Sequence, residues 1–158
     1  MNKHIRVILI SLLLLTGCKG EMPKLGIDNG QLHTCPSTPN CVNSQIIDEK
    51  HYIEPILTIG TRLEVKNHIL DILNESKNSK VIVIKDNYIR AEFTSKLFRF
   101  VDDVEFYFPD TQSKEITIQV RSASRVGHSD LGVNQKRIEQ IRSKFQVISK
   151  KSGNSNAK

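Results

Sequence analysis

The sequence lacks the short motifs by which several classes of enzyme are recognised. It contains no nucleophile elbow, no H-E-x-x-H pair and no phosphate-binding glycine loop. Its three cysteines include no C-x-x-C pair, which excludes the usual thiol–disulfide redox motif, and no internal repeat is visible. These absences exclude the most readily recognised catalytic chemistries and leave binding, assembly or an unusual reaction.

The chain also lacks a strong imbalance of charge. Its 23 Lys and Arg against 17 Asp and Glu give a formal net charge of +6, and removal of residues 1–17 would lower this charge by two. Nucleic-acid binding requires a clustered basic stripe, which is absent, so we expect no nucleic-acid partner. A mildly basic chain is still suited to anionic headgroups.

The first residues have the pattern of an export signal. Lys3, His4 and Arg6 precede an almost wholly apolar run from Val7 to Leu15. A helix that spans a bilayer needs about 20 residues, so this run is too short to remain as a membrane helix. We therefore expect residues 1–17 to be a signal peptide.

The end of this signal resembles the bacterial lipobox. Leu15-Thr16-Gly17-Cys18 places small residues and a cysteine directly after the apolar core. The resemblance implies that Cys18 receives a diacylglycerol, and that acyl chains such as palmitate then hold the protein on a membrane. We expect a lipid-anchored, extracytoplasmic protein of the cell envelope; Lys19 favours the outer membrane, facing the periplasm, in a Gram-negative host. An ordinary secretory signal with an incidental Cys18 is the alternative.

The mature chain is expected to comprise a tether, one domain and a tail. Residues 18–34 contain turn-forming glycines and Pro23 without an apolar period, which predicts an acylated tether. Residues 35–149 are long enough for a single domain with one core. Residues 150–158 are polar throughout and are expected to be a disordered tail.

Two cysteines remain once Cys18 is acylated, and both lie in the sequence CPSTPNC. An extracytoplasmic compartment is oxidising, so Cys35 and Cys41 are predicted to form a disulfide that closes a small loop. The alternative is a metal site with His33 or His51 as further ligands, but zinc sites usually have cysteines two residues apart. We therefore predict no metal and no cofactor.

Hydrophobic periodicity predicts the order of the remaining elements. Residues 51–59 are typical of an edge strand around Pro55, and Thr61 with Glu64 forms a capping box that begins a helix. Alternation of apolar and polar residues then predicts four strands, at 81–84, 88–94, 97–108 and 116–121.

A second helix follows these strands. Apolar residues recur at three- and four-residue spacing from Ile138 to Ile148, with Asn134 as the expected N-cap and Val133 with Ile138 as the expected hydrophobic staple. The element order predicts an α+β fold with a single antiparallel sheet and two helices on one face. This order resembles the TATA-binding-protein-like arrangement; a helix-grip fold is the alternative.

Three stretches together closely resemble the domain of unknown function 1499 family. They are CPSTPNCVNSQ at 35–45, FRFVDDVEF at 98–106 and RSASRVGHSDLGVNQKRIEQIR at 121–142. The resemblance implies a compact domain that is often exported or attached to a membrane, and it brings no established activity, cofactor or catalytic residue. His128 stands where an aromatic residue is common in that loop, which weakens any scheme with His128 as an essential acid or base.

The charged residues of the second and third stretches have a structural interpretation. Asp102 shares strand parity with apolar residues, so its carboxylate is expected to point toward the core and to need a partner. Arg121 or Arg125 would supply a bidentate partner. In this interpretation, charged pairs fix the sheet to the loop before the last helix, through Asp102, Asp103, Arg121, Arg125 and Asp130.

A second interpretation is a site for an anion or a partner. The candidates carry cationic or amide side chains on the charged sheet face or near the N-terminus of the last helix: Arg90, Arg99, Arg121, Arg125, His128 and Asn134. The ligand would be an anionic small molecule, a lipid headgroup or an envelope protein. Glu92, Asp103 and Glu105 share the sheet face and would neutralise these arginines.

A third interpretation is a hydrolase-like envelope enzyme. Asp102, Asp103, His128 and Asp130 are the residues that would supply its carboxylates and imidazole. None of the serines in this region has a demonstrable base beside it, so the catalytic residues remain unknown. The sequence favours a non-catalytic binding or assembly module of the cell envelope.

Overall fold

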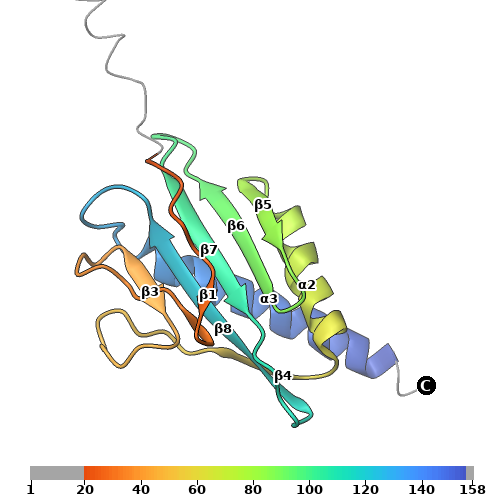
Figure 1. Ribbon diagram of the computed structural model, residues 1–158. Coiled ribbons are helices and arrows are strands. Elements are labelled where there is room, and N and C mark those ends of the chain that lie inside the picture. Colours follow the sequence, from red (N-terminus) through yellow and green to blue (C-terminus); the bar gives the residue numbers. More distant parts are fainter. Residues whose placement is uncertain (1–19, 156–158) are drawn as a thin grey trace, which may run out of the picture.

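The computed structural model describes the backbone of residues 20–155 and the side chains of residues 20–150. Residues 1–19, which include the predicted signal peptide and Cys18, and residues 156–158 lie outside the described residues. Figure 1 shows a twisted sheet whose rear face is covered by two helices. The opposite face is crossed by the first described segment, which includes the label β1.

The main sheet has six strands and is antiparallel throughout. Its order is β3-β8-β7-β6-β5, and β4 pairs with β8 beside β3. The strands are β3 (Cys41–Asn43), β4 (Ile56–Ile59), β5 (Ser79–Ile84), β6 (Tyr88–Thr94), β7 (Val101–Tyr107) and β8 (Glu115–Ser124). The predicted edge strand begins at Ile56, directly after Pro55, because proline has no N–H to donate to the ladder.

Helix α2 (Arg62–Glu75) begins with the predicted capping box. The Glu64 amide donates to Thr61 Oγ1 over 3.3 Å, and the Thr61 amide donates to Glu64 Oε2 over 3.0 Å. The backbone hydrogen bond from Thr61 lowers the pKa of the Glu64 carboxyl. The two reciprocal bonds therefore satisfy backbone donors that the first turn would leave free.

Both helices and the sheet contribute to one apolar core. Helix α2 buries Ile69 and Ile72, and α3 (Val133–Ser155) buries Ile138 and Phe145 at helical spacing. The even residues of β7 and β8 complete the core from the sheet side: Val104, Phe106, Ile116, Ile118 and Val120. The predicted α+β class, with an antiparallel sheet and two helices, is confirmed.

The single sheet of the prediction needs a correction. Residues 27–32 form a second, two-stranded sheet of β1 (Ile27–Asp28) and β2 (Gln31–Leu32). Leu32 is buried against Tyr88 and Tyr107 on the sheet face away from the helices. Residues 20–33, which we call the strap, are thus folded onto the domain, although the sequence predicts a tether over residues 18–34.

The ends of three predicted elements also differ. Strand β7 begins at Val101 because Arg99 has a φ of 59°, in the left-handed region, so Phe98 and Phe100 lie outside the sheet. Helix α3 begins at Val133, which places Asn134 inside the first turn and excludes the predicted cap and staple. The backbone of α3 is helical to Ser155, within the segment expected to be a disordered tail.

Candidate functional site

The sheet face beneath the strap carries a buried cluster of charged side chains. Arg90 donates through Nε and Nη2 to Asp103 Oδ1, at 3.0 and 2.6 Å. Arg125 approaches the same carboxylate from the end of β8 and donates through Nε to Oδ2 over 2.7 Å. Arg125 also forms an ion pair with Glu92. The hydrogen bonds to Asp103 raise the pKa of the Arg125 guanidinium, so this group stays charged.

The strand register explains why two arginines are needed. Glu92 on β6 lies directly opposite Asp103 on β7. Two like charges facing each other across neighbouring strands destabilise a sheet. Arg90 and Arg125 bring positive charge to this pair of carboxylates. The side chains of Arg90, Asp103 and Arg125 are each more than nine-tenths buried.

A second buried group lies further along the same face. Glu105 accepts hydrogen bonds from Tyr88 over 2.7 Å and from Arg121 Nη1 over 3.0 Å, and its side chain is fully buried. Burial, together with the charge of Glu105, raises the pKa of the Tyr88 hydroxyl. Nε of Arg121 is buried without a hydrogen-bond partner within the described part of the chain. Arg121 is nevertheless neutralised by the carboxylate directly opposite it.

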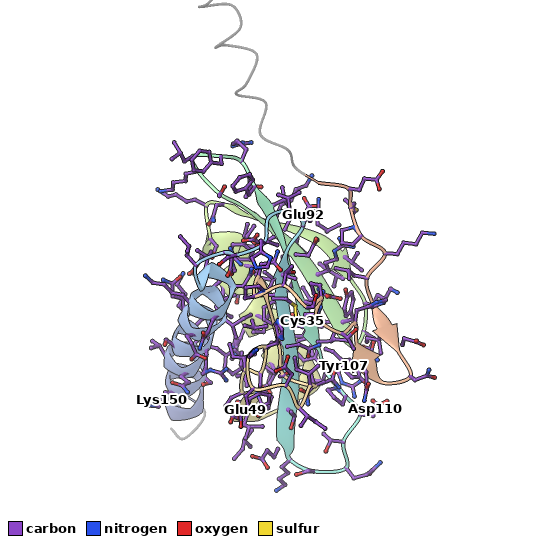
Figure 2. The ribbon with its side chains drawn as sticks, turned by 90° about the vertical axis from the view of Figure 1, so that its left-hand side faces the viewer. Cys35, Glu49, Glu92, Tyr107, Asp110 and Lys150 are labelled. Carbon is purple, nitrogen blue, oxygen red and sulfur yellow. A yellow bond between two sulfur atoms is a disulfide. The ribbon has the colours of Figure 1, made fainter. Side chains whose placement is uncertain are left out.

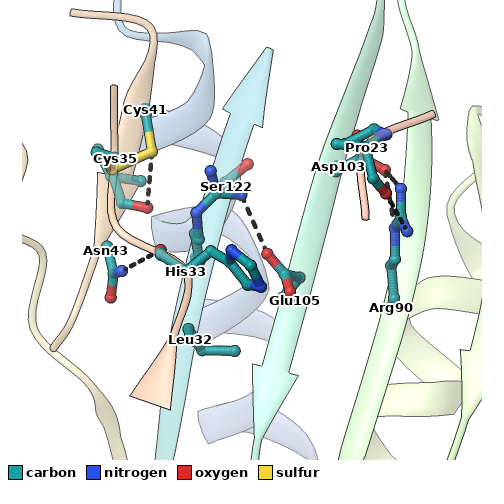
Figure 3. Close-up of polar contacts among 12 residues, drawn as sticks. Pro23, Leu32, His33, Cys35, Cys41, Asn43, Arg90, Asp103, Glu105 and Ser122 are labelled. Carbon is teal, nitrogen blue, oxygen red and sulfur yellow. Dashed lines mark hydrogen bonds and ion pairs between the residues drawn. A yellow bond between two sulfur atoms is a disulfide. The ribbon is translucent and has the colours of Figure 1, made fainter. Parts of the chain in front are cut away.

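The strap lies over this face and contacts it directly. Arg90 Nη1 donates to the carbonyl of Pro23 over 3.1 Å, a contact drawn in Figure 3. The same view shows His33, whose carbonyl accepts from Asn43 Nδ2 over 2.9 Å, beside β3. The three arginines of the face are thus matched by three carboxylates, Glu92, Asp103 and Glu105, beneath a covering segment.

A separate polar cluster lies on the helix side of the sheet. Asn134 accepts from Ser122 Oγ over 2.5 Å and donates to the Asn40 carbonyl over 3.0 Å. Arg137 donates to Asn134 Oδ1 over 2.6 Å and to Asp102 Oδ2 over 2.5 Å. The three stretches quoted from the sequence therefore meet here, since Asn40 comes from the first, Asp102 from the second and the others from the third.

For Asp102, the predicted direction of the carboxylate is correct, but the predicted partner is wrong. Its carboxylate points toward the helix side, as the strand parity predicts. Its partner is Arg137 on α3, rather than Arg121 or Arg125, because those two arginines lie on the opposite face. The Arg137 guanidinium also lies over the Phe93 ring, 4.9 Å from its centroid.

Asp130 has a different role from the one expected. Its carboxylate accepts from the Gly132 amide over 3.1 Å and from the Asn134 amide over 2.7 Å. These bonds satisfy amides at the start of α3 and place negative charge at the positive end of the helix. Asp130 therefore caps α3, and the charged network that joins sheet and helix uses Arg137 instead.

The candidate anion site is not assembled in the predicted form. Arg90, Arg121 and Arg125 are engaged by carboxylates under the strap. Arg99 and His128 lie exposed in two different loops. Asn134 is buried, and its side chain is engaged by Ser122 and Asn40. The six candidates are thus divided between the strap face, the helix face and two loops.

The hydrolase candidates are also separated. Asp102 and Asp103 are neighbours in β7 but point to opposite faces, toward Arg137 and Arg90 respectively. His128 is exposed in the loop before α3. The structure does not bring these residues and Asp130 to one centre.

The CPSTPNC loop contains the predicted disulfide between Cys35 and Cys41. His51, the alternative ligand, instead shares a 2.6 Å contact between Nδ1 and Asp48 Oδ2, and its Nε2 lies 3.1 Å from the Thr38 carbonyl. The hydrogen bond with His51 lowers the pKa of the Asp48 carboxyl. Within residues 20–150, no group of three or more His, Cys, Asp or Glu side chains is arranged to hold a metal ion.

Comparison with known proteins defines the family. The family described as "Protein of unknown function (DUF1499)" matches residues 31–145, which is more than half of the chain. The chain therefore belongs to this family, as the three stretches of sequence predicted. No curated protein matches the sequence. In the described part of the chain, no helix has the length and apolar character needed to cross a bilayer.

Several residues of the site have no signal in the sequence that predicts their role. Asn40 lies in a loop and Arg137 in a helix, so the alternation of a strand cannot predict which way their side chains point. The one available signal is that Arg137 lies about one helical turn beyond Asn134. Tyr88 alternates with Ile89, which places it on the charged face, but only the pairing of β6 with β7 brings its hydroxyl to Glu105. The strap has no periodic pattern of apolar residues that would predict its strands.

Proposed function

We propose that this protein is a lipid-anchored protein of the bacterial cell envelope and that its domain is a non-catalytic binding or assembly module. The pairing of the buried ionisable groups carries this proposal. Arg90, Arg121 and Arg125 are held by carboxylates beneath the strap. A general acid or base must reach a substrate, whereas these groups are covered and engaged with one another.

The anchor is supported by the sequence Leu15-Thr16-Gly17-Cys18. A Cβ atom built on Gly20 would lie 2.8 Å from Arg125 Cβ, so the chain already lies against the domain at this residue. Two residues span at most about 7 Å. An acylated Cys18 would therefore hold the domain directly at the membrane surface.

The test is metabolic labelling of the full chain in a bacterial host with a palmitate analogue. We expect the label on the wild-type chain and none on Cys18→Ala. The double variant Cys35→Ser and Cys41→Ser is the matched control, since it removes the other two cysteines and keeps the label. Absence of label from the wild-type chain, or label retained in Cys18→Ala, would contradict the proposed anchor.

The binding role is tested by crosslinking in intact cells, followed by identification of whatever is captured. We expect a reproducible envelope component that is lost when the anchor is removed. The hydrolase alternative makes the opposite prediction, a turnover that both Asp102→Asn and His128→Ala abolish. Such a loss in both variants would overturn the non-catalytic proposal.

A further inference from the structure

The connection between β6 and β7 exposes three large apolar side chains. Leu97, Phe98 and Phe100 are 80%, 60% and 41% exposed, and the two phenyl rings stack with centroids 5.5 Å apart. The loop is closed by the Ser95 amide, which donates to the Phe100 carbonyl over 2.8 Å. Residues 95–100, which we call the hairpin tip, thus present a fixed apolar group. Exposed apolar groups of this kind mark contact surfaces.

A basic cavity of about 310 Å³ lies beside the hairpin tip. Its cationic lining residues are Lys77, Lys80, Lys96 and Arg99, and its other lining residues are Asn, Ser and Thr. No carboxylate lines it, in contrast to the arginines under the strap. Four cations around one hollow raise the local concentration of anions, and hydroxyl and amide groups beside them are suitable donors for phosphate oxygens.

The hairpin tip and the start of the strap lie at the same end of the molecule. Gly20 packs against Arg125, whose amide donates to the carbonyl of Val101, the residue that follows the tip. Figure 1 shows the start of the coloured strap beside the β6–β7 connection, and Figure 2 labels Glu92 near this end, far from Asp110 and Lys150. The residue proposed to carry the acyl chains is two positions before Gly20.

We propose that the hairpin tip inserts into the interfacial layer of an anionic phospholipid bilayer, with the phosphate of a headgroup in the basic cavity. This inference rests on the proposed acyl anchor, which would hold this end of the domain against the membrane. Phe and Leu side chains of membrane-surface segments are buried at the boundary between headgroups and acyl chains, and each nearby Lys or Arg adds attraction to anionic lipid. The exposed acids Glu21 and Glu75 lie in neighbouring segments and leave the four cavity cations in excess.

The absence of tryptophan from the sequence allows a direct test. Phe98→Trp places a single fluorescent reporter on the hairpin tip of the full chain, reconstituted in vesicles of phosphatidylethanolamine and phosphatidylglycerol. Ile59→Trp is the matched control, because Ile59 is exposed and pairs with Glu115 at the opposite end of β8. We expect a blue shift and quenching by lipids brominated on their acyl chains for the first reporter, and neither change for the second.

The charge component is tested in the Phe98→Trp background. Lys96→Glu with Arg99→Glu should remove the quenching in phosphatidylglycerol vesicles, whereas Lys114→Glu, an exposed control outside the cavity, should leave it unchanged. Quenching that is equal in neutral phosphatidylcholine vesicles and insensitive to the charge reversals would overturn the headgroup assignment. A reporter that stays exposed in all vesicles and is shielded only by an added membrane protein would overturn the insertion.

The two proposals fail separately. The mass of the N-terminal peptide reports acylation of Cys18, whereas the Phe98→Trp emission reports the hairpin tip. An acylated chain with an exposed tip overturns this inference and leaves the anchor in place. An unmodified Cys18 with an embedded, quenched tip overturns the anchor and supports the membrane contact.

Discussion

The strap-covered face and the hairpin tip contain similar numbers of cations but present them in opposite ways. Under the strap, each arginine faces a carboxylate and is more than nine-tenths buried. At the tip, four cations line a hollow without a carboxylate, beside exposed aromatic rings. A cluster of cationic side chains therefore indicates a binding surface only when its charge is left unmatched. By this criterion, the tip is the surface that is available to a ligand.

The largest expected effect comes from breaking the matched cluster. Asp103→Asn keeps the volume of the side chain but leaves Arg90 and part of Arg125 as uncompensated buried charges, so we expect a loss of about 3–5 kcal/mol in the free energy of unfolding. Asp110→Asn removes an exposed partner of Arg62 and should cost at most about 1 kcal/mol. Urea denaturation of both variants measures the difference; equal losses would show that the buried cluster is not special.

A smaller effect is expected from loosening the strap. Leu32→Ala removes a buried side chain from its contacts with Tyr88 and Tyr107 and should lower the free energy of unfolding by about 2–3 kcal/mol. Ile47→Ala, at a 99% exposed position, should change it by less than about 0.5 kcal/mol. Amide hydrogen exchange should also accelerate along residues 20–33 in Leu32→Ala, and unchanged exchange there would contradict a packed strap.

The covered face also predicts a dependence of stability on alkaline pH. The raised pKa of Tyr88 means that the unfolded chain loses this proton near pH 10, while the folded chain retains it. The folded state then binds more protons, so its stability falls as pH rises above about 10, by up to about 1.4 kcal/mol per pH unit from this group. Tyr88→Phe removes this contribution. The difference in the free energy of unfolding between the wild-type protein and Tyr88→Phe should therefore narrow as the pH rises above about 10. A difference that is constant with pH would contradict the burial of this hydroxyl.

The smallest effect is expected at the hairpin tip. Phe98→Ser and Leu97→Ser change exposed side chains, so each should alter the free energy of unfolding in water by less than about 0.5 kcal/mol. Calorimetry of the domain without lipid checks this value. A loss of several kcal/mol would show that the aromatic tip serves the fold, and would remove the contrast with the strap-covered face.

The sequence predicted the elements whose patterns are local. Alternation in residues 88–94 and 116–121 placed Arg90 and Arg121 on the charged face, and the capping box located the first helix. Strand parity also gave the direction of Asp102. These features depend on neighbours within a few residues, which the sequence displays directly.

The remaining features depend on contacts between distant segments. The strap has no period, and its order comes from single contacts such as Pro23 with Arg90, which lie 67 residues apart. Strand parity cannot show that Arg137, on a helix, reaches Asp102. The alternation predicts a strand from residue 97, whereas β7 begins at Val101, because the pattern does not reveal the left-handed turn at Arg99.

The exchange of arginine Nε–H protons with D₂O tests the matched charges most directly. Nε of Arg90 and of Arg125 donates to Asp103 beneath the strap, so the Nε–H signals of these two residues should exchange slowly, while that of exposed Arg99 exchanges fast. Both slow signals should be lost in Asp103→Asn and should be unaffected by inorganic phosphate. Fast exchange of all arginines in the wild-type protein, or a shift of these two signals on addition of phosphate, would show that these charges are not matched by Asp103.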